Sequence, residues 1–312
     1  MNSLPLVVAD LPVGPVVERM LAGKVTLLPW SERRPQVTGL YTYGHPVVND
    51  ELLAAFPALR VVSNFGVGVD HIDVKAAERR GIPVGNTPGI LDGATADLGF
   101  ALLLAVGRRV VEGDRYARGP GFTRYDPSLI LGREIHGSTL GIIGMGRIGE
   151  QVARRARGFE MTVLYHNRQR RPQAEQETGV RLVSRDELLK AADFVILTVP
   201  LTPETTGLIG KAELALMKPT ACLINIARGA VVDKEALTVA LRTKQIYAAA
   251  LDVTDPEPLP RDHPLLKLDN VIITPHLGSA TDQTRERMAG RSVENLLAGL
   301  AGRALPYQVE IA

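Results

Sequence analysis

Short apolar runs rich in Val, Ile and Leu alternate along this chain with stretches in which apolar residues recur every three or four positions. The runs have the length of strands, and the stretches have the period of helices. In the N-terminal part the predicted strands are residues 6–9, 25–28, 39–43, 60–64 and 83–86, and the predicted helices are residues 13–21, 50–56 and 73–80. Strands that alternate with helices form parallel sheets, so the pattern predicts an α/β fold.

A long apolar stretch at residues 94–116 predicts one helix that separates this first set of elements from a second set. Asp92 or Thr95 is expected to cap it. The predicted strands of the second set are residues 139–143, 161–165, 194–199, 222–226, 248–253 and 271–274. The sequence therefore predicts two doubly wound parallel-sheet domains.

Residues typical of helix ends occur between the later strands. Ser184 with Glu187 forms a predicted capping box, Thr202-Pro203 predicts another helix start, and Asp233 a third. A last helix is predicted at residues 282–297 with Gly299 as its C-terminal cap. This helix leads out of the second domain, so the closing segment is expected to return to the first domain.

A glycine motif follows the first strand of the second domain directly. Residues 144–149 read Gly-Met-Gly-Arg-Ile-Gly, between the apolar strand and a stretch of helical period that starts at Ile148. In this setting the first glycine allows a tight turn, the second lets the backbone approach a pyrophosphate, and the third lets the helix pack on the strand. Unpaired N–H groups at the helix start would hold the phosphates. The motif predicts a dinucleotide site.

The end of the next strand bears on which dinucleotide is bound. A site for NAD usually has an Asp or Glu there, which bonds the 2′-hydroxyl of the ribose. Residues 166–171 instead read His-Asn-Arg-Gln-Arg-Arg, and guanidinium groups suit a phosphate dianion. One charge-assisted contact is worth about 1.5–3 kcal/mol, a preference of roughly ten- to a hundredfold. The sequence predicts NADP(H) as the preferred cofactor and NAD(H) as the second, with a solvated basic loop as the alternative reading.

Composition excludes several other classes of protein. The net charge of +2 gives no general attraction to nucleic acid, and no apolar run has the length of a membrane span. The only cysteine, Cys222, cannot form a disulfide framework or a cysteine zinc site. The chain start lacks the pattern of a secretory signal. We expect a cytoplasmic protein without metal, nucleic-acid or membrane partners.

Polar residues follow three of the later strands where those strands end. Arg228 follows the strand at residues 222–226, and His276 follows the strand at 271–274. Asp252 lies near the end of the strand at 248–253, and Glu257 follows it. In open α/β sheets ligands bind outside the carboxyl ends of the strands. These side chains are therefore expected to converge on one site.

These residues carry a resemblance to a known family. The glycine motif, Arg228, Glu257 and His276 are similar, in order and context, to those of the D-isomer-specific 2-hydroxyacid dehydrogenases, and the resemblance covers nearly the whole chain. Within the family the chain most resembles the glyoxylate/hydroxypyruvate reductases. The segments that carry this likeness are residues 64–70, 225–229, 255–260 with 263–266, and 276–281.

The resemblance implies an NADPH-preferring enzyme that reduces short 2-oxo acids to D-2-hydroxy acids. His276 would donate the proton, Glu257 would hold the other ring nitrogen of His276, and Arg228 would bind the carboxylate and polarise the ketone. The backbone N–H groups of Val67 and Gly68, together with Ser279, would complete the substrate site.

The resemblance also implies a division of the chain and a set of cofactor contacts. Residues 1–96 and 282–312 would form a smaller flavodoxin-like substrate domain, and residues 97–281 a Rossmann domain inserted into it. The implied cofactor-binding residues are Thr95, Gly144, Gly146, Arg147, Ile148, Gly149, Asn167, Arg168, Val199, Pro200, Thr205, Ile226, Asp252, His276 and Gly278.

Other readings of the sequence stay open. The substrate could be a 2-ketoaldonate or another 2-oxo acid, and corepressor-like nucleotide sensors share the fold and the catalytic residues. Some glyoxylate/hydroxypyruvate reductases place a Trp over the substrate from the segment before the glycine strand, where this chain has none; its only Trp is Trp30. The apolar helix around residues 98–106 predicts a twofold homodimer.

Overall fold

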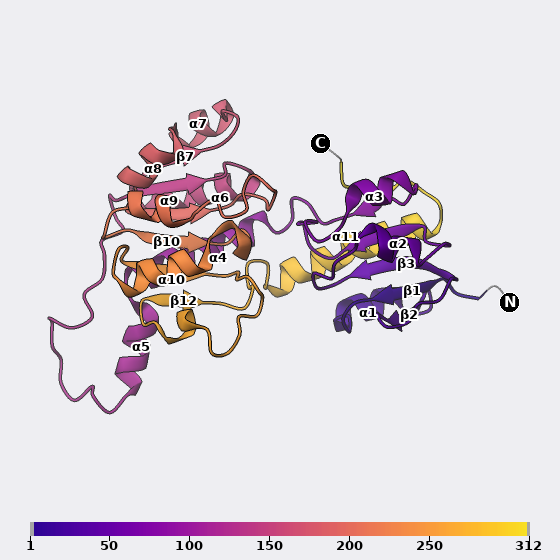
Figure 1. Ribbon diagram of the computed structural model, residues 1–312, viewed down its shortest axis with the longest axis horizontal. Coiled ribbons are helices and arrows are strands. Elements are labelled where there is room, and N and C mark those ends of the chain that lie inside the picture. The colour runs from indigo at the N-terminus through magenta and orange to yellow at the C-terminus, as the bar shows by residue number, and fades with distance from the viewer. Residues whose placement is uncertain (1–2, 311–312) are drawn as a thin grey trace. The chain divides into compact units, whose positions relative to one another are not determined.

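The structure, a computed structural model, describes residues 3–310 of the chain. It contains two compact units, one formed by the chain up to Leu91 and from Ala280 onward, the other by Asp92–Ser279. Each is a layered α/β unit (Figure 1). The boundary between the units falls at the first residue of helix α4 (Asp92–Gly107), because the first turn of a continuous helix belongs with the rest of it.

The smaller unit contains a five-stranded parallel sheet in the order β2-β1-β3-β4-β5. Its strands are β1 (Leu6–Ala9), β2 (Thr26–Pro29), β3 (Val37–Thr42), β4 (Val61–Asn64) and β5 (Val84–Gly85). This is the flavodoxin-like order. The strands β3 and β4 at its centre are almost fully buried, as a parallel sheet covered on both faces requires.

Four helices belong to this unit: α1 (Pro15–Leu21), α2 (Asp50–Ala54), α3 (Val74–Arg79) and α11 (Asp282–Leu300). Helix α11 packs on β3 and β4, where Ser63 Oγ donates to the carbonyl of Ser292 at 2.7 Å. A Cβ at Gly299 would overlap the side chain of Val61. The prediction that Gly299 caps this helix is therefore wrong, because Gly299 lies inside the helix and allows it to approach β4.

The larger unit contains a seven-stranded parallel sheet in the order β12-β11-β10-β9-β6-β7-β8. Its strands are β6 (Thr139–Ile143), β7 (Thr162–His166), β8 (Arg181–Leu182), β9 (Phe194–Leu197), β10 (Cys222–Asn225), β11 (Ala248–Leu251) and β12 (Val271–Ile273). When the strands are numbered from β6 as 1 and the sheet is read from its β8 edge, the order begins 3-2-1-4-5-6. This is the order of the Rossmann fold. The predicted pair of doubly wound parallel-sheet domains is confirmed.

Helices cover both faces of this sheet. Besides α4 they are α5 (Val110–Arg118), α6 (Arg147–Ala156), α7 (Pro172–Thr178), α8 (Arg185–Ala191), α9 (Lys211–Leu216) and α10 (Lys234–Arg242). One apolar core contains residues of α4 and α6, and a second contains residues of α8, α9 and α10. Ser184 and Asp233 cap α8 and α10 as predicted.

The single helix predicted over residues 94–116 is instead two helices, α4 and α5. The chain turns between them at Arg109, whose φ is 52°, and the carbonyl of Gly107 accepts from the N–H of Arg133 at 2.7 Å. The hydrogen bond from Arg133 thus occupies the carbonyl that would accept the next N–H group of a continuous helix. The expectation that Asp92 or Thr95 caps the helix is also wrong, since both lie inside α4. Within residues 3–310 no helix is both long and apolar enough to cross a membrane.

Candidate active site

The glycine motif forms the turn between β6 and α6. Gly144 has a φ of 103°, which side chains rarely tolerate, and a Cβ at Gly149 would overlap the carbonyl oxygen of Gly144. At Gly146, the N-cap of α6, no described atom beyond the adjacent residues lies within 4 Å of the position a Cβ would take. The first and third glycines thus serve the packing of the turn itself. The second faces open space at a helix N-terminus, where N–H groups and the helix dipole favour a pyrophosphate.

The basic loop after β7 is fixed to this turn. Asn167 Oδ1 accepts from the N–H of Met145 at 3.3 Å. The buried Tyr165 donates its hydroxyl to Glu175 at 2.6 Å and accepts from the N–H of Arg171 at 2.8 Å. Glu175 also pairs with Arg170, its nearest oxygen 2.7 Å from Nη2. Arg170 is therefore engaged within the protein, whereas the exposed guanidinium of Arg168 makes no hydrogen bond or ion pair with the residues the structure describes.

The chain after β9 passes directly over the glycine turn. A Cβ at Gly144 would come within 2.9 Å of the Val199 side chain. No helix begins at Thr202, contrary to the prediction, and turns occupy residues 203–207. The Thr205 hydroxyl explains this, because it donates to the carbonyl of Pro200 at 2.6 Å and accepts from the N–H of Thr202 at 2.8 Å. These bonds close a turn that presents Val199 and Pro200 at the carboxyl edge of the sheet.

Three neighbouring parallel strands bring the predicted chemical residues to this same edge. Arg228 follows β10, Glu257 follows β11, and His276 follows β12. His276 Nδ1 lies 2.7 Å from Glu257 Oε1, and both side chains are about one-third exposed. The other oxygen of Glu257 accepts from the N–H of Thr254 at 3.1 Å, so the carboxylate is held from both sides.

The loop that carries Arg228 packs main chain against main chain on the loop that carries Glu257. A Cβ at Gly229 would overlap the carbonyl of Thr254, so only glycine permits this approach. Asn225, which is 1% exposed, donates to the carbonyl of Arg228 at 2.9 Å and accepts from the N–H of Ala227 at 3.0 Å. The contribution of Asn225 is visible only in the structure, because the bonds span two and three residues of an irregular turn.

Asp252 holds the loop that carries His276. Its carboxylate accepts from the Thr274 hydroxyl at 2.7 Å and from the N–H groups of Leu277 and Gly278 at 2.7 and 2.8 Å. Burial raises the pKa of this carboxyl above its usual value, although these three hydrogen bonds oppose the change. The bonds bracket His276, whose φ of 56° needs such support. This structural role of Asp252 could not be inferred from the sequence, because its partners Leu277 and Gly278 lie 25 and 26 residues away along the chain.

The other predicted residues of the larger unit lie around these loops. A Cβ at Gly278 would come within 3.2 Å of the Thr95 side chain, and Ile226 packs its Cδ1 on Gly99 of α4. Arg147 is exposed at the first position of α6, and Ile148 packs on the core. Ser279 is half-buried at the end of the unit. In the part of the chain that the structure describes, no group of three or more His, Cys, Asp and Glu side chains is placed to hold a metal ion.

In the smaller unit, Val67 and Gly68 lie in the loop after β4. The carbonyls of this loop accept internal hydrogen bonds, for example from Asn86 Nδ2 to Val67 at 2.8 Å. Neither N–H group, of Val67 or of Gly68, donates to another of the described residues. The two successive N–H groups therefore form a potential anion site.

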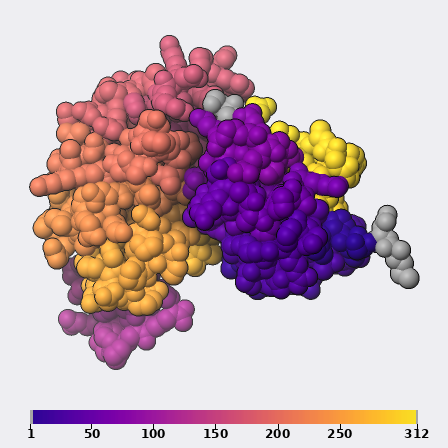
Figure 2. Space-filling model, turned by 45° about the vertical axis from the view of Figure 1, so that its right-hand side comes forward, coloured from indigo at the N-terminus to yellow at the C-terminus, as the bar shows by residue number. Residues whose placement is uncertain are grey.

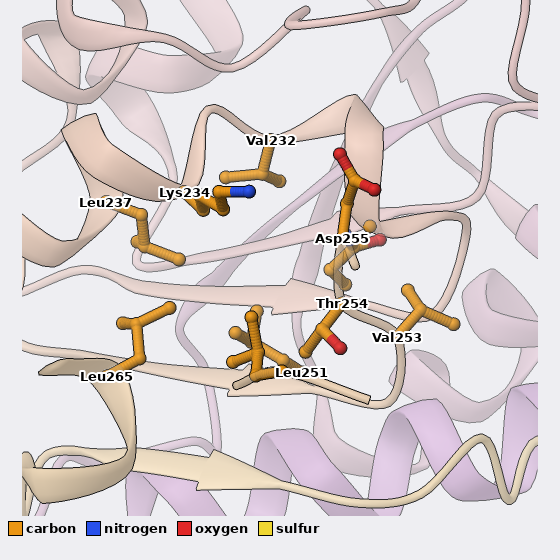
Figure 3. Close-up of a pocket in the computed structure, with 11 residues that line it drawn as sticks. Val232, Lys234, Leu237, Leu251, Val253, Thr254, Asp255 and Leu265 are labelled. Carbon is orange, nitrogen blue, oxygen red and sulfur yellow. The ribbon is translucent and has the colours of Figure 1, made fainter. Parts of the chain in front are cut away.

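A small cavity lies behind the loops that follow β10 and β11 (Figure 3). Its volume is about 20 Å³, enough for one water molecule and far too little for a dinucleotide. Apolar side chains line much of it, among them Val232, Leu237, Leu251 and Leu265, with Lys234 and Asp255 at its polar side. It is a packing feature beneath the site and not the site itself.

Comparison with known proteins agrees with this arrangement. Residues 100–278 match the NAD-binding domain of D-isomer specific 2-hydroxyacid dehydrogenases. The chain is 51% identical over 263 residues to the glyoxylate reductase of Korarchaeum cryptofilum, which covers 84% of this chain and 79% of that one.

Solved structures are similar over nearly the whole length. A protein of Thermus thermophilus matches with a TM-score of 0.88 and 45% identity, over 98% of this chain and all of that one. The NADPH-dependent glyoxylate/hydroxypyruvate reductase of Sinorhizobium meliloti, solved with NADP and malonate, matches with a TM-score of 0.86 and 32% identity, over 98% and 97% of the two chains.

Fold and comparisons together define an enzyme, a dehydrogenase that uses a nicotinamide dinucleotide. The chain belongs to the D-isomer specific 2-hydroxyacid dehydrogenase family and is similar to its glyoxylate reductases.

Replacing Gly146 by Ala tests the cofactor turn. Because a Cβ there meets open space, Gly146→Ala should leave the melting temperature unchanged while raising the Kd for NADP(H) about tenfold or more, as the methyl displaces the pyrophosphate. Gly210→Ala is the matched control, since Gly210 is also an N-cap residue with an extended backbone in the same unit. Equal cofactor affinity of the two variants, measured by fluorescence titration, would contradict the assignment of this turn.

Proposed function

We propose that this protein reduces the short 2-oxo acids glyoxylate and hydroxypyruvate to D-2-hydroxy acids, with NADPH as the preferred cofactor. The observation that carries the proposal is the 2.7 Å contact between His276 and Glu257, at the edge of the sheet whose glycine turn fits a dinucleotide. The names of the Korarchaeum and Sinorhizobium relatives support this substrate class.

The reaction needs a hydride and a proton at one carbonyl. The bound nicotinamide supplies the hydride to the ketone carbon. His276 donates the proton to the ketone oxygen from Nε2, since Nδ1 is engaged by Glu257. The Glu257 carboxylate keeps the ring oriented so that Nε2 faces the substrate for the transfer.

Two groups are proposed to hold the substrate carboxylate. The Arg228 guanidinium binds it by charge-assisted hydrogen bonds and polarises the ketone, which stabilises negative charge on the oxygen in the transition state. The N–H groups of Val67 and Gly68 provide the second set of donors, and Ser279 is proposed to lie beside the substrate.

The cofactor contacts follow from the positions of the loops. The start of α6, with Arg147 and Ile148, is proposed to bind the pyrophosphate. Asp252 accepts three internal donors, and since a carboxylate has about four acceptor positions, one remains for the nicotinamide amide. The other proposed contacts are Thr95, Val199, Pro200, Thr205, Ile226 and Gly278.

The preference for NADPH is proposed to rest on Arg168. The loop after β7 has no carboxylate that would bond a ribose 2′-hydroxyl, and Arg170 is engaged by Glu175. Arg168 is exposed on that loop, next to Asn167, which is bonded to the glycine turn. A guanidinium in this position suits a 2′-phosphate.

We also propose a homodimer, formed through the segment 110–131 that contains α5. Helix α4, from which a dimer is expected, packs on α6 and the sheet of its own unit but leaves Ala101 exposed and Leu98 and Leu104 partly exposed. The segment 110–131 projects from that unit (Figures 1 and 2) and exposes large apolar side chains, with Tyr125 at 82% and Leu131 at 66%. A groove of about 1040 Å³ beside it fits the same segment of a second copy.

Turnover with glyoxylate tests the proposed reaction. The purified protein should oxidise NADPH when glyoxylate is added, and His276→Ala should lower kcat at least about a hundredfold while NADPH still binds, because the proton donor is lost. His136→Ala is the matched control, since His136 also contacts a glutamate, Glu160, at 3.1 Å on the exposed surface. Absence of NADPH oxidation with every short 2-oxo acid would exclude the proposed function.

Replacing Arg168 tests the choice of cofactor. Arg168→Ala should raise the KM for NADPH about ten- to a hundredfold and leave the KM for NADH unchanged, because only the contact with the 2′-phosphate is removed. Arg170→Ala, which removes a guanidinium engaged by Glu175, should change the two KM values much less. A wild-type enzyme that uses NADH as well as NADPH would contradict the preference itself.

Light scattering tests the dimer. The wild type should have twice the chain mass of 33.7 kDa, and Tyr125→Asp combined with Leu131→Asp should shift it to the monomer by placing charges in an apolar contact. Val239→Asp, at an exposed apolar position of α10, is the control that should remain dimeric. A monomeric wild type would overturn this proposal.

A further inference from the structure

The loop after β4 is fixed through its carbonyl groups. The amide of Asn64 donates to the carbonyl of Gly66 at 2.9 Å and to that of Gly68 at 2.8 Å. The amide of Asn86 donates to the carbonyl between them, that of Val67, at 2.8 Å. Three successive peptide groups are thus each held by a side-chain amide.

Holding these carbonyls also sets the direction of the N–H groups. In a planar trans peptide the C=O of one residue and the N–H of the next point in opposite directions. The carbonyl of Gly66 faces Asn64, so the N–H of Val67 faces away from it. By the same geometry the N–H of Gly68 faces away from Asn86.

The orientation of the Asn64 amide is itself fixed. Its Oδ1 accepts from the hydroxyl of Thr42 at 2.7 Å, which leaves the amino group for the two carbonyls. Thr42 is 0% and Asn64 1% exposed, so water does not compete for these bonds. Three of the four hydrogen-bonding positions of this amide side chain are used for the loop and its anchor.

We propose that Asn64 is the positioning residue of the substrate carboxylate site, with Thr42 setting its orientation and Asn86 holding the middle peptide. This inference rests on the proposed function, which assigns the N–H groups of Val67 and Gly68 to the carboxylate. Asn64 does not contact the substrate. By holding the carbonyl of Gly66 it directs the N–H of Val67 away from itself before an anion arrives, as Asn86 does for the N–H of Gly68, so binding does not require the loop to rearrange.

Asn64→Asp tests the proposal with almost no change in volume. A carboxylate would face the carbonyl oxygens of Gly66 and Gly68, which favours rotation of those peptides and turns the N–H of Val67 away from the anion site. The KM for glyoxylate and the Kd of oxamate, measured by calorimetry, should each rise about ten- to a hundredfold, as expected when charge-assisted hydrogen bonds are lost. The value of kcat and the affinity for NADPH should stay within about threefold of wild type. The lost contacts bind the carboxylate equally in the ground state and in the transition state, so their loss raises KM and not the barrier.

Asn270→Asp is the matched control. Asn270 also donates to two backbone carbonyls, those of Leu241 and Tyr247, each at 3.1 Å, but it lies in the larger unit away from the chemical loops. Its variant should leave the KM for glyoxylate and the Kd of oxamate unchanged. Wild-type values of both in Asn64→Asp, or a loss of NADPH affinity equal to the loss of oxamate affinity, would overturn the proposal.

If circular dichroism shows that Asn64→Asp does not fold, substitutions at Thr42 test the same proposal. Thr42→Ser keeps the hydroxyl and should retain oxamate affinity, whereas Thr42→Val removes it with the same shape and should weaken oxamate binding. Equal affinities in these two variants would overturn the proposal. The oxamate titration does not require turnover, so it tests the role of Asn64 independently of the reaction. If the wild type binds oxamate but does not reduce glyoxylate, the proposed reaction is wrong. The same variants then still decide whether Asn64 positions the carboxylate site.

Discussion

Close approach of main chain to main chain at the carboxyl edge of the seven-stranded sheet is the constraint on which the active site depends. At Gly149 it brings α6 onto the turn of Gly144, and at Gly229 it brings the Arg228 loop onto Thr254. A Cβ at either position would overlap a carbonyl group. The loops of Gly229 and Thr254 follow the buried parallel strands β10 and β11, and the turn of Gly144 follows the buried strand β6. The loops can therefore separate only by disturbing the sheet, which makes their arrangement rigid before any ligand binds.

Much of this could be predicted from the sequence because the signals are local. A glycine motif directly after an apolar strand, and the order of alternating strands and helices, specify a doubly wound fold without long-range information. Gly144 allows the tight turn and Gly149 allows the close approach of helix to turn, as the spacing of the motif predicts. Arg228, Glu257 and His276 could be placed together because carboxyl ends of neighbouring parallel strands share one edge.

The features that the sequence did not reveal depend on partners far along the chain. The break between α4 and α5 needs the N–H of Arg133, and the role of Gly299 inside α11 needs the side chain of Val61. Apolar periodicity through residues 94–116 is equally compatible with one helix or two. Likewise, no local pattern shows that Asn64 bonds Thr42, since these residues become neighbours only when β3 pairs with β4.

The two units fix their chemical loops in opposite ways, and the chemistry of each loop explains the choice. Asp252 is a carboxylate and accepts from the N–H groups of Leu277 and Gly278, which leaves the side chain of His276 as the group that this loop presents. Asn64 supplies donors to the carbonyls of its loop, which leaves backbone N–H groups as the groups that this loop presents. An aspartate in place of Asn64 would have no donor for these carbonyls, and an asparagine in place of Asp252 would have one acceptor oxygen where the carboxylate has two. The identity of each buried anchor thus decides whether its loop presents a side chain or its own backbone.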